Sequence, residues 1–180
     1  MKDRITHNKP LPKPAFFIMR NVLKLRRNPE KIQGILEQAG VKEGMKILDY
    51  GCGIGSYAIE AAKLAGKSGK VVAADINEKM LQEVQKNMHT DGLSNIHPQL
   101  ITAPEDVNGN KFDVIFLIDV LHLLKDPLQT IEAMFRKLTA TGKLLVKFEH
   151  FSEPRINSLL AEIQCSNKSV IDGKYWLLNK

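Results

Sequence analysis

The chain has 180 residues, 43% of them hydrophobic and 26% charged, a balance typical of one globular domain with a sizeable core. No apolar run approaches the roughly 20 residues that span a bilayer, and the polar first 13 residues lack the apolar core of a signal peptide. The two cysteines, Cys52 and Cys165, provide no disulfide framework, so we expect a cytoplasmic protein.

The formal net charge of +6 is concentrated near the N-terminus, because residues 1–46 hold eleven Lys or Arg against four Asp or Glu. Such an excess suits an anionic substrate, RNA or a membrane surface. A solvated basic face is the simpler interpretation, and we favour it.

Residues 1–28 are predicted to form an N-terminal arm followed by a basic amphipathic helix. Three prolines favour an extended arm over residues 1–14: Pro10, Pro12 and Pro14. Apolar and basic residues then alternate over residues 15–27 at the spacing of a short amphipathic helix. This helix could cover an active site, contact a membrane surface or pack on the core.

The main domain is predicted to span residues 29–180. It opens with a helix over residues 29–39, which Asn28 caps and Gly40 ends.

A glycine-rich stretch at the start of this domain organises the rest of the chain. An apolar strand over residues 45–48 ends at Asp49, and a helix over residues 58–65 follows the loop. Three glycines alternate in that loop: Gly51, Gly53 and Gly55. Glycines let a ligand lie against bare backbone, and the start of the helix offers unpaired N–H groups.

The spacing of the glycines separates two classes of ligand. Dinucleotide sites read G-x-G-x-x-G, whereas here the third glycine comes one residue early. Asp49 would repel a pyrophosphate and attract an ammonium group. An acid followed by G-x-G-x-G resembles the first motif of the class I S-adenosylmethionine-dependent methyltransferase family. The alternative is a glycine-rich turn that binds nothing.

The resemblance implies that the loop packs against the methionine part of the cofactor, with Asp49 near its amino group. The residues implied in this contact are Asp49, Tyr50, Gly51, Cys52, Gly53 and Gly55.

A second strand is predicted over residues 70–75, and its last residue, Asp75, lies 20 residues after Gly55. An acid at this place can accept hydrogen bonds from ribose hydroxyl groups. The resemblance adds Ile76 and Met80 to the cofactor-binding residues. Alternatively, Asp75 only caps the helix predicted over residues 77–90.

The loop after a third strand, over residues 95–102, departs from the family. Thr102 stands where an Asp that meets the adenine amino group is often found, and Ala103 and Pro104 follow. We include these three residues in the cofactor site. Thr102, a backbone group or Glu105 could supply the adenine contact.

A fourth strand over residues 111–118 is apolar enough to be buried on both faces. Ile118 and Asp119 complete the predicted cofactor site, and the segment through His122 is similar to that of the small-molecule methyltransferase branch. His122 is our candidate catalytic base, because its imidazole titrates near neutral pH. An equally simple interpretation is that His122 packs under the loop. Weaker candidates are Glu149, His150 and Tyr57.

The remaining segments complete an α/β pattern. We expect a helix over 128–138, a turn over 139–142, a strand over 144–148, a helix over 154–163, and short strands over 169–172 and 174–178. Alternating strands and helices predict a three-layer, Rossmann-like methyltransferase fold, with helices on both faces of a mostly parallel sheet. Ligands then bind at the carboxyl ends of the strands.

These patterns predict an S-adenosylmethionine-dependent methyltransferase that releases S-adenosylhomocysteine and acts on a small-molecule acceptor by in-line transfer. Positions 118–121 lack the Asn-Pro-Pro-Tyr type of motif that marks nucleic-acid methyltransferases, and no cluster has metal-ligand spacing. Two alternatives stay open. A non-catalytic cofactor-binding module would show no turnover, and a nicotinamide-dependent oxidoreductase would bind a dinucleotide.

Overall fold

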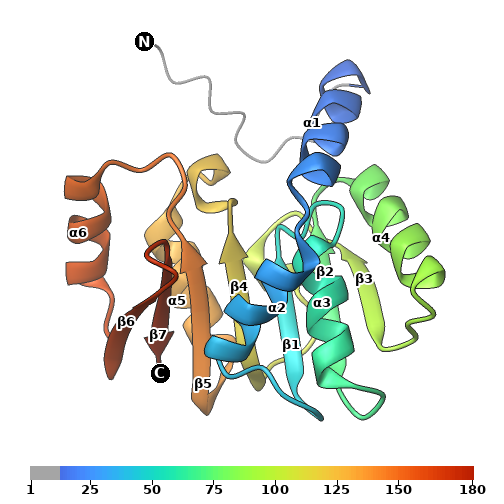
Figure 1. Ribbon diagram of the computed structural model, residues 1–180. Helices are drawn as coiled ribbons and strands as arrows, with labels where there is room; N and C mark the ends of the chain where they lie inside the picture. The colour runs from blue at the N-terminus through green and yellow to red at the C-terminus, as the bar shows by residue number, and fades with distance from the viewer. Residues whose placement is uncertain (1–12) are drawn as a thin grey trace.

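A computed structural model describes residues 13–180, apart from the side chains of Lys13, Phe16 and Arg26. A central sheet lies between two layers of helices (Figure 1). In chain order the elements are α1 (Lys13–Arg26), α2 (Pro29–Gln38), β1 (Lys46–Tyr50), α3 (Ser56–Ala65), β2 (Lys70–Asp75), α4 (Glu78–Thr90), β3 (Ile96–Leu100), η1 (Pro104–Asp106), β4 (Phe112–Ile118), η2 (Leu121–Leu123), α5 (Pro127–Lys137), β5 (Leu138–Lys147), α6 (Glu153–Glu162), β6 (Asn167–Ile171) and β7 (Tyr175–Asn179).

The sheet has seven strands in the order β3-β2-β1-β4-β5-β7-β6. The first five strands are mutually parallel, and β7 pairs antiparallel with both β5 and β6. This arrangement confirms the predicted three-layer Rossmann-like class. Because the carboxyl ends of parallel strands share one edge of the sheet, the loops after β1, β2 and β4 meet there.

Two apolar cores hold the layers together. One face of the sheet packs against α2, α3 and α4, with Ile47 and Phe116 fully buried beneath them. The opposite face packs against α5 and α6, with Ile115 and Leu117 fully buried. Burial on both faces explains why β4 is apolar at nearly every position.

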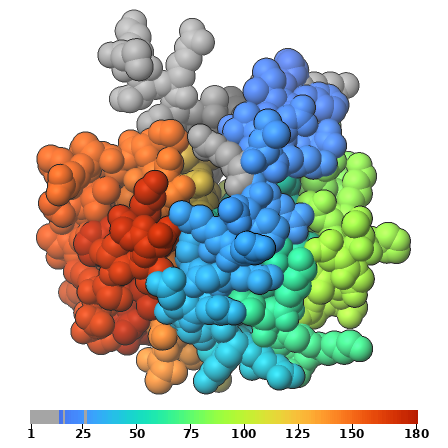
Figure 2. Space-filling model, in the orientation of Figure 1, coloured from blue at the N-terminus to red at the C-terminus, as the bar shows by residue number. Residues whose placement is uncertain are grey.

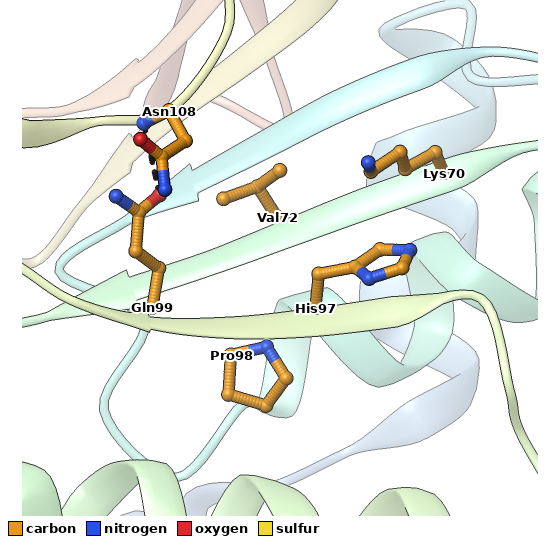
Figure 3. A pocket seen from close by; sticks show the side chains of 6 residues that line it. All are labelled: Lys70, Val72, His97, Pro98, Gln99 and Asn108. Atoms are coloured by element: carbon orange, nitrogen blue, oxygen red, sulfur yellow. Dashed lines mark hydrogen bonds between the residues drawn. The ribbon is translucent and has the colours of Figure 1, made fainter.

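The connection between β3 and β4 differs from the other parallel crossovers. It contains only the three-residue 3-10 helix η1, whereas α3, α4 and α5 fill the other connections. A shallow hollow, lined among others by Val72, His97 and Gln99, lies on the β2–β3 part of the sheet (Figure 3). None of the predicted site residues lines it. β3 forms one edge of the sheet and contains Pro98.

Two predictions about local structure were wrong. The turn expected over residues 139–142 belongs to β5, because Leu138 already pairs with Phe112 and the register then shifts before Val114 pairs with Lys143. The extended arm ends earlier than expected, since α1 begins at Lys13; the rest of the predicted arm lies outside the described residues.

Asn28 caps α2 as predicted, accepting a hydrogen bond from the Lys31 amide at 3.0 Å. Across residues 13–180, no helix is both long and apolar enough to cross a bilayer.

Candidate active site

The loop between β1 and α3 wraps around the carboxylate of Asp49. Asp49 is 3% exposed, and its Oδ2 accepts a hydrogen bond from the Ala58 amide at 3.0 Å, in the first turn of α3. Gly51, Gly53 and Gly55 all have positive φ, between 53° and 80°. These backbone angles explain the glycine spacing, because other residues adopt them at a cost.

Asp49 is an acid buried in an environment that disfavours its charge. Burial raises its pKa from 3.8 to about 7, and the nearby charge of Asp75 adds to the effect. The hydrogen bond from Ala58 acts in the opposite direction. Among the described side chains, none forms an ion pair with Asp49. The site therefore favours a ligand that brings a positive charge to this carboxylate.

Asp75 links the two predicted cofactor motifs. Its Oδ2 accepts a hydrogen bond from the Gly53 amide at 2.9 Å, and its Oδ1 accepts one from the Asn77 amide at 2.8 Å. The cap of α4 is Asn77, whose Oδ1 accepts from the Lys79 amide. Asp75 therefore is not the cap of α4 but joins the glycine loop to the residue that caps this helix. The Ile76 amide also donates to Asp75, so the carboxylate keeps a lone pair for one further donor.

The glycine loop is packed closely on its protein side. A Cβ at position 51 would lie 2.4 Å from Val120 Cγ2, in the loop after β4. Cys52 is buried, which raises the pKa of its thiol well above the usual value and makes it a poor nucleophile. Ile118 is buried at the end of β4, and Ile76 is half-buried after β2.

The N-terminal helix α1 stands over this loop, next to α4 (Figure 2). Leu23 packs against Ile54 and the buried Met80, and its Cδ1 lies 3.3 Å from where a Cβ on Gly53 would be. Met80, predicted to touch the cofactor, is thus covered by α1.

Ion pairs fix α1 in place. Glu83 of α4 receives Arg20 Nε and Lys24 Nζ, each at 3.0 Å, and Arg27 reaches the fully buried Glu60 of α3 at 3.0 Å. Several charges of the basic N-terminal segment therefore pair with acids of the main domain, and the interpretation as a solvated basic face was wrong for these residues. The outward face of α1 carries apolar side chains, among them Ile18 and Leu25, 67% and 87% exposed.

Residues 102–104 form a tight turn at the end of β3. Asp106 Oδ2 accepts hydrogen bonds from the amide and the hydroxyl of Thr102, both at 2.7 Å, and from the Ala103 amide at 3.0 Å. These bonds lower the pKa of Asp106. Because the Thr102 hydroxyl already donates to Asp106, it has only lone pairs to offer a ligand. Burial, aided by the negative charges of Glu105 and Asp106, raises the pKa of the neighbouring Tyr50 to about 12.

Charged and imidazole groups gather where β4 and β5 end. Lys147 Nζ lies 2.9 Å from Asp119 Oδ1 and 2.8 Å from Glu149 Oε2. The rings of His122 and His150 meet edge to face with centroids 4.6 Å apart. Burial and the charge of His150 lower the pKa of His122, which favours the neutral imidazole.

A pair of tyrosines joins this cluster to the glycine loop. The hydroxyl groups of Tyr57, in α3, and Tyr175, in β7, are 2.6 Å apart. Burial and this hydrogen bond raise the pKa of Tyr57 far above the usual value, so the phenol stays protonated. The sequence indicated Tyr57, Glu149 and His150 only weakly, and reasoning from it missed Lys147 and Tyr175. A lysine ending the apolar run 144–146 was the available signal for Lys147.

The structure therefore brings most of the predicted site residues to one edge of the sheet. Asp49, Asp75, Asp119 and the glycine loop meet there, and His122 lies just beyond β4. The side chains of Met80 and Cys52 are buried.

Comparison with known proteins agrees with this geometry. A family model described as a methyltransferase domain matches residues 41–176. The ubiquinone/menaquinone biosynthesis C-methyltransferase UbiE of Cronobacter sakazakii is 34% identical over 121 residues, which cover 66% of this chain and 47% of that protein. The chain thus spans about half the length of the curated relatives it matches.

Two solved structures share the fold. An S-adenosylmethionine-dependent methyltransferase from Aquifex aeolicus superposes with a TM-score of 0.70 at 24% identity, covering 89% of this chain and 96% of that one. An S-adenosylmethionine-dependent O-methyltransferase from Thermotoga maritima gives 0.67 at 19% identity, covering 88% and 68%. Since the family model extends over most of the domain that builds the site, the chain belongs to the class I S-adenosylmethionine-dependent methyltransferase family.

Proposed function

We propose that this protein transfers a methyl group from S-adenosylmethionine to a small-molecule acceptor at the carboxyl edge of the sheet. The observation that carries the proposal is Asp49, a buried carboxylate beside the glycine loop that has no ion-pair partner among the described side chains. Binding of a ligand ammonium would supply the missing charge.

The chain's residues fit this cofactor in two further respects. Asp75 keeps a lone pair for a ribose hydroxyl beside the three amides that already donate to it. The uncharged turn of residues 102–104 follows β3, and Tyr50 lies close enough to Asp75 and Asp106 to interact with their charges. An adenine attached to a ribose held by Asp75 would reach this part of the edge. When bound, S-adenosylmethionine supplies an electrophilic methyl group on a sulfonium.

The role of the protein in such a displacement is mainly to hold the acceptor close and in line. A carbon acceptor must also lose the proton from the carbon that receives the methyl group. We assign this proton to His122, whose lowered pKa keeps the imidazole available as a base at neutral pH. Cofactor binding by the glycine loop and proton removal by His122 would thus occupy adjoining parts of one edge.

The relatives named as C-methyltransferases support a carbon acceptor on a small molecule. Of the roles predicted for the N-terminal helix, we propose that α1 covers the site rather than contacting a membrane surface. Its basic residues Arg20 and Lys24 turn to Glu83, which leaves them unavailable to anionic lipids. The division at residue 28 and a cytoplasmic location, which suits the free thiols of Cys52 and Cys165, belong to the same proposal.

Calorimetric titration with S-adenosylhomocysteine tests this function. Wild type should bind, and Asp75→Ala should lose most of the affinity. Asp172→Ala, an exposed carboxylate in the β6–β7 turn, is the matched control and should bind like wild type. Failure of the folded wild-type protein to bind would refute the proposal, whereas binding that survives Asp75→Ala would refute only the ribose role. Incubation with methyl-labelled S-adenosylmethionine and candidate acceptors would then separate an enzyme from a non-catalytic module.

A further inference from the structure

One lysine joins the two loops that border the proposed acceptor site. Lys147 is the last residue of β5, and its side chain is 17% exposed. Its ammonium group pairs with Asp119, in the loop after β4, and with Glu149, in the loop after β5. The two carboxylates are 40% and 36% exposed, so the lysine is the best-buried member of the group.

The same two loops carry the paired imidazoles. His122 follows Asp119 by three residues, and His150 directly follows Glu149. Asp119 and His150 both have left-handed backbone angles, with φ of 55° and 66°. Non-glycine residues held in this region cluster at functional sites, because the surrounding contacts must over-determine the conformation.

We propose that Lys147 is a positioning residue: by bridging Asp119 and Glu149 it fixes the loops that bring His122 against His150 and keeps both carboxylates from pairing with His122. This inference rests on the proposed function, since it assigns Lys147 a place in the acceptor site. It adds a residue that acts through others and touches neither the cofactor nor the reacting atoms.

The charges around His122 explain why this bridge matters. The negative charges of Asp119 and Glu149 act to raise the pKa of His122, whereas its burial and the nearby His150 lower it. The burial and the His150 charge prevail, so the pKa is below its ordinary value. A lysine that binds both carboxylates holds them in place and opposes their charge. Without it, the two acids would be free to turn toward His122 and raise its pKa. The imidazole would then be protonated, and unable to accept a proton, over a wider pH range.

An NMR titration of the His122 imidazole tests the proposal without cofactor or acceptor. The carbon-bound ring protons would be followed against pH in wild type and in Lys147→Met, with His122→Gln to assign the signal. We expect the pKa of His122 to rise in Lys147→Met and to return toward the wild-type value in Lys147→Arg. Asp119→Asn and Glu149→Gln, with Lys147 intact, should each lower it.

Lys63→Met is the matched control. Lys63 also bridges two carboxylates, Glu60 at 3.2 Å and Asp91 at 2.9 Å. It lies in the last turn of α3, at the end of the helix opposite to the glycine loop. It should leave the titration of His122 unchanged. An unaltered or lowered pKa of His122 in folded Lys147→Met would overturn the proposal, as would an equal shift in both lysine variants.

The carboxylate variants keep the test decisive should Lys147→Met not fold, because a pKa of His122 that neither variant lowers also overturns it. The titration does not depend on cofactor binding. A protein that fails to bind S-adenosylhomocysteine yet shows the expected shifts would therefore contradict the proposed function alone.

Discussion

Replacing Asp49 by Asn should stabilise the fold at alkaline pH while weakening the proposed cofactor site. The pKa of this carboxyl is about 7 in the folded chain, against an ordinary 3.8. The unfolded chain therefore releases the proton at lower pH than the folded chain, and the stability given by protonated Asp49 is lost as pH rises toward 7. At about 1.4 kcal/mol per pKa unit, the wild type loses about 3 kcal/mol between pH 5 and pH 8 from this group.

Asp49→Asn has no such titration, and its side-chain oxygen can still accept the hydrogen bond from Ala58. Urea unfolding at the two pH values should show the variant gaining about 3 kcal/mol on wild type at pH 8 relative to pH 5. In thermal melts the same gain amounts to about 6–12 °C for a chain of this length. Asp172→Asn should show no gain of this kind.

A stability difference between Asp49→Asn and wild type that is the same at both pH values would refute the reasoning, because Asp49 would then be ionised at little cost. Binding of an ammonium-bearing ligand should favour ionised Asp49, so S-adenosylhomocysteine should release about half a proton at pH 7. Calorimetry in buffers of different ionisation enthalpy measures that release.

Three further predictions concern packing around the site. Gly51→Ala should destabilise the fold by about 1–3 kcal/mol more than the control Gly92→Ala, measured by urea unfolding. Both positions have positive φ, but only a Cβ at position 51 would clash with Val120. Equal losses of stability in the two variants would exclude the clash. Glu83→Gln should loosen α1, because the ion pairs of Arg20 and Lys24 are lost; the measurement is faster amide exchange in residues 14–26 without change in α5. Unaltered exchange would show that Leu23 and the Arg27–Glu60 pair are enough to hold the helix. Tyr175→Phe should cost about 1 kcal/mol through loss of the hydroxyl pair, and a neutral effect would mean that water replaces it.

The parts of the site that the sequence could predict are those encoded locally. The acid, the glycines and the helix start lie within a few residues of one another, and their backbone angles follow from residue type. The contacts that complete the site join distant segments: Tyr57 and Tyr175 are 118 positions apart, and Leu23 reaches Gly53 from a separate helix. No pattern of spacing encodes such pairs.

Long-range pairing also explains the wrong predictions. Residues 139–142 have the composition of a turn, yet β4 provides partners that extend them as a strand. The basic residues of α1 and Arg27 directly after it resemble a solvated face, but the structure pairs them with Glu83 and Glu60. In both cases tertiary contacts outweigh the local signal.

The edges of the sheet have a consequence for solubility. Within residues 13–180 no strand pairs with the outer side of β3, and such an edge strand can recruit another chain through its backbone groups. Pro98, in the middle of β3, lacks the amide hydrogen that an added strand would need. At the other edge, β6 begins Asn167-Lys168-Ser169, all exposed and polar. Both edges are thus poor templates for growth, which opposes edge-to-edge aggregation of this sheet.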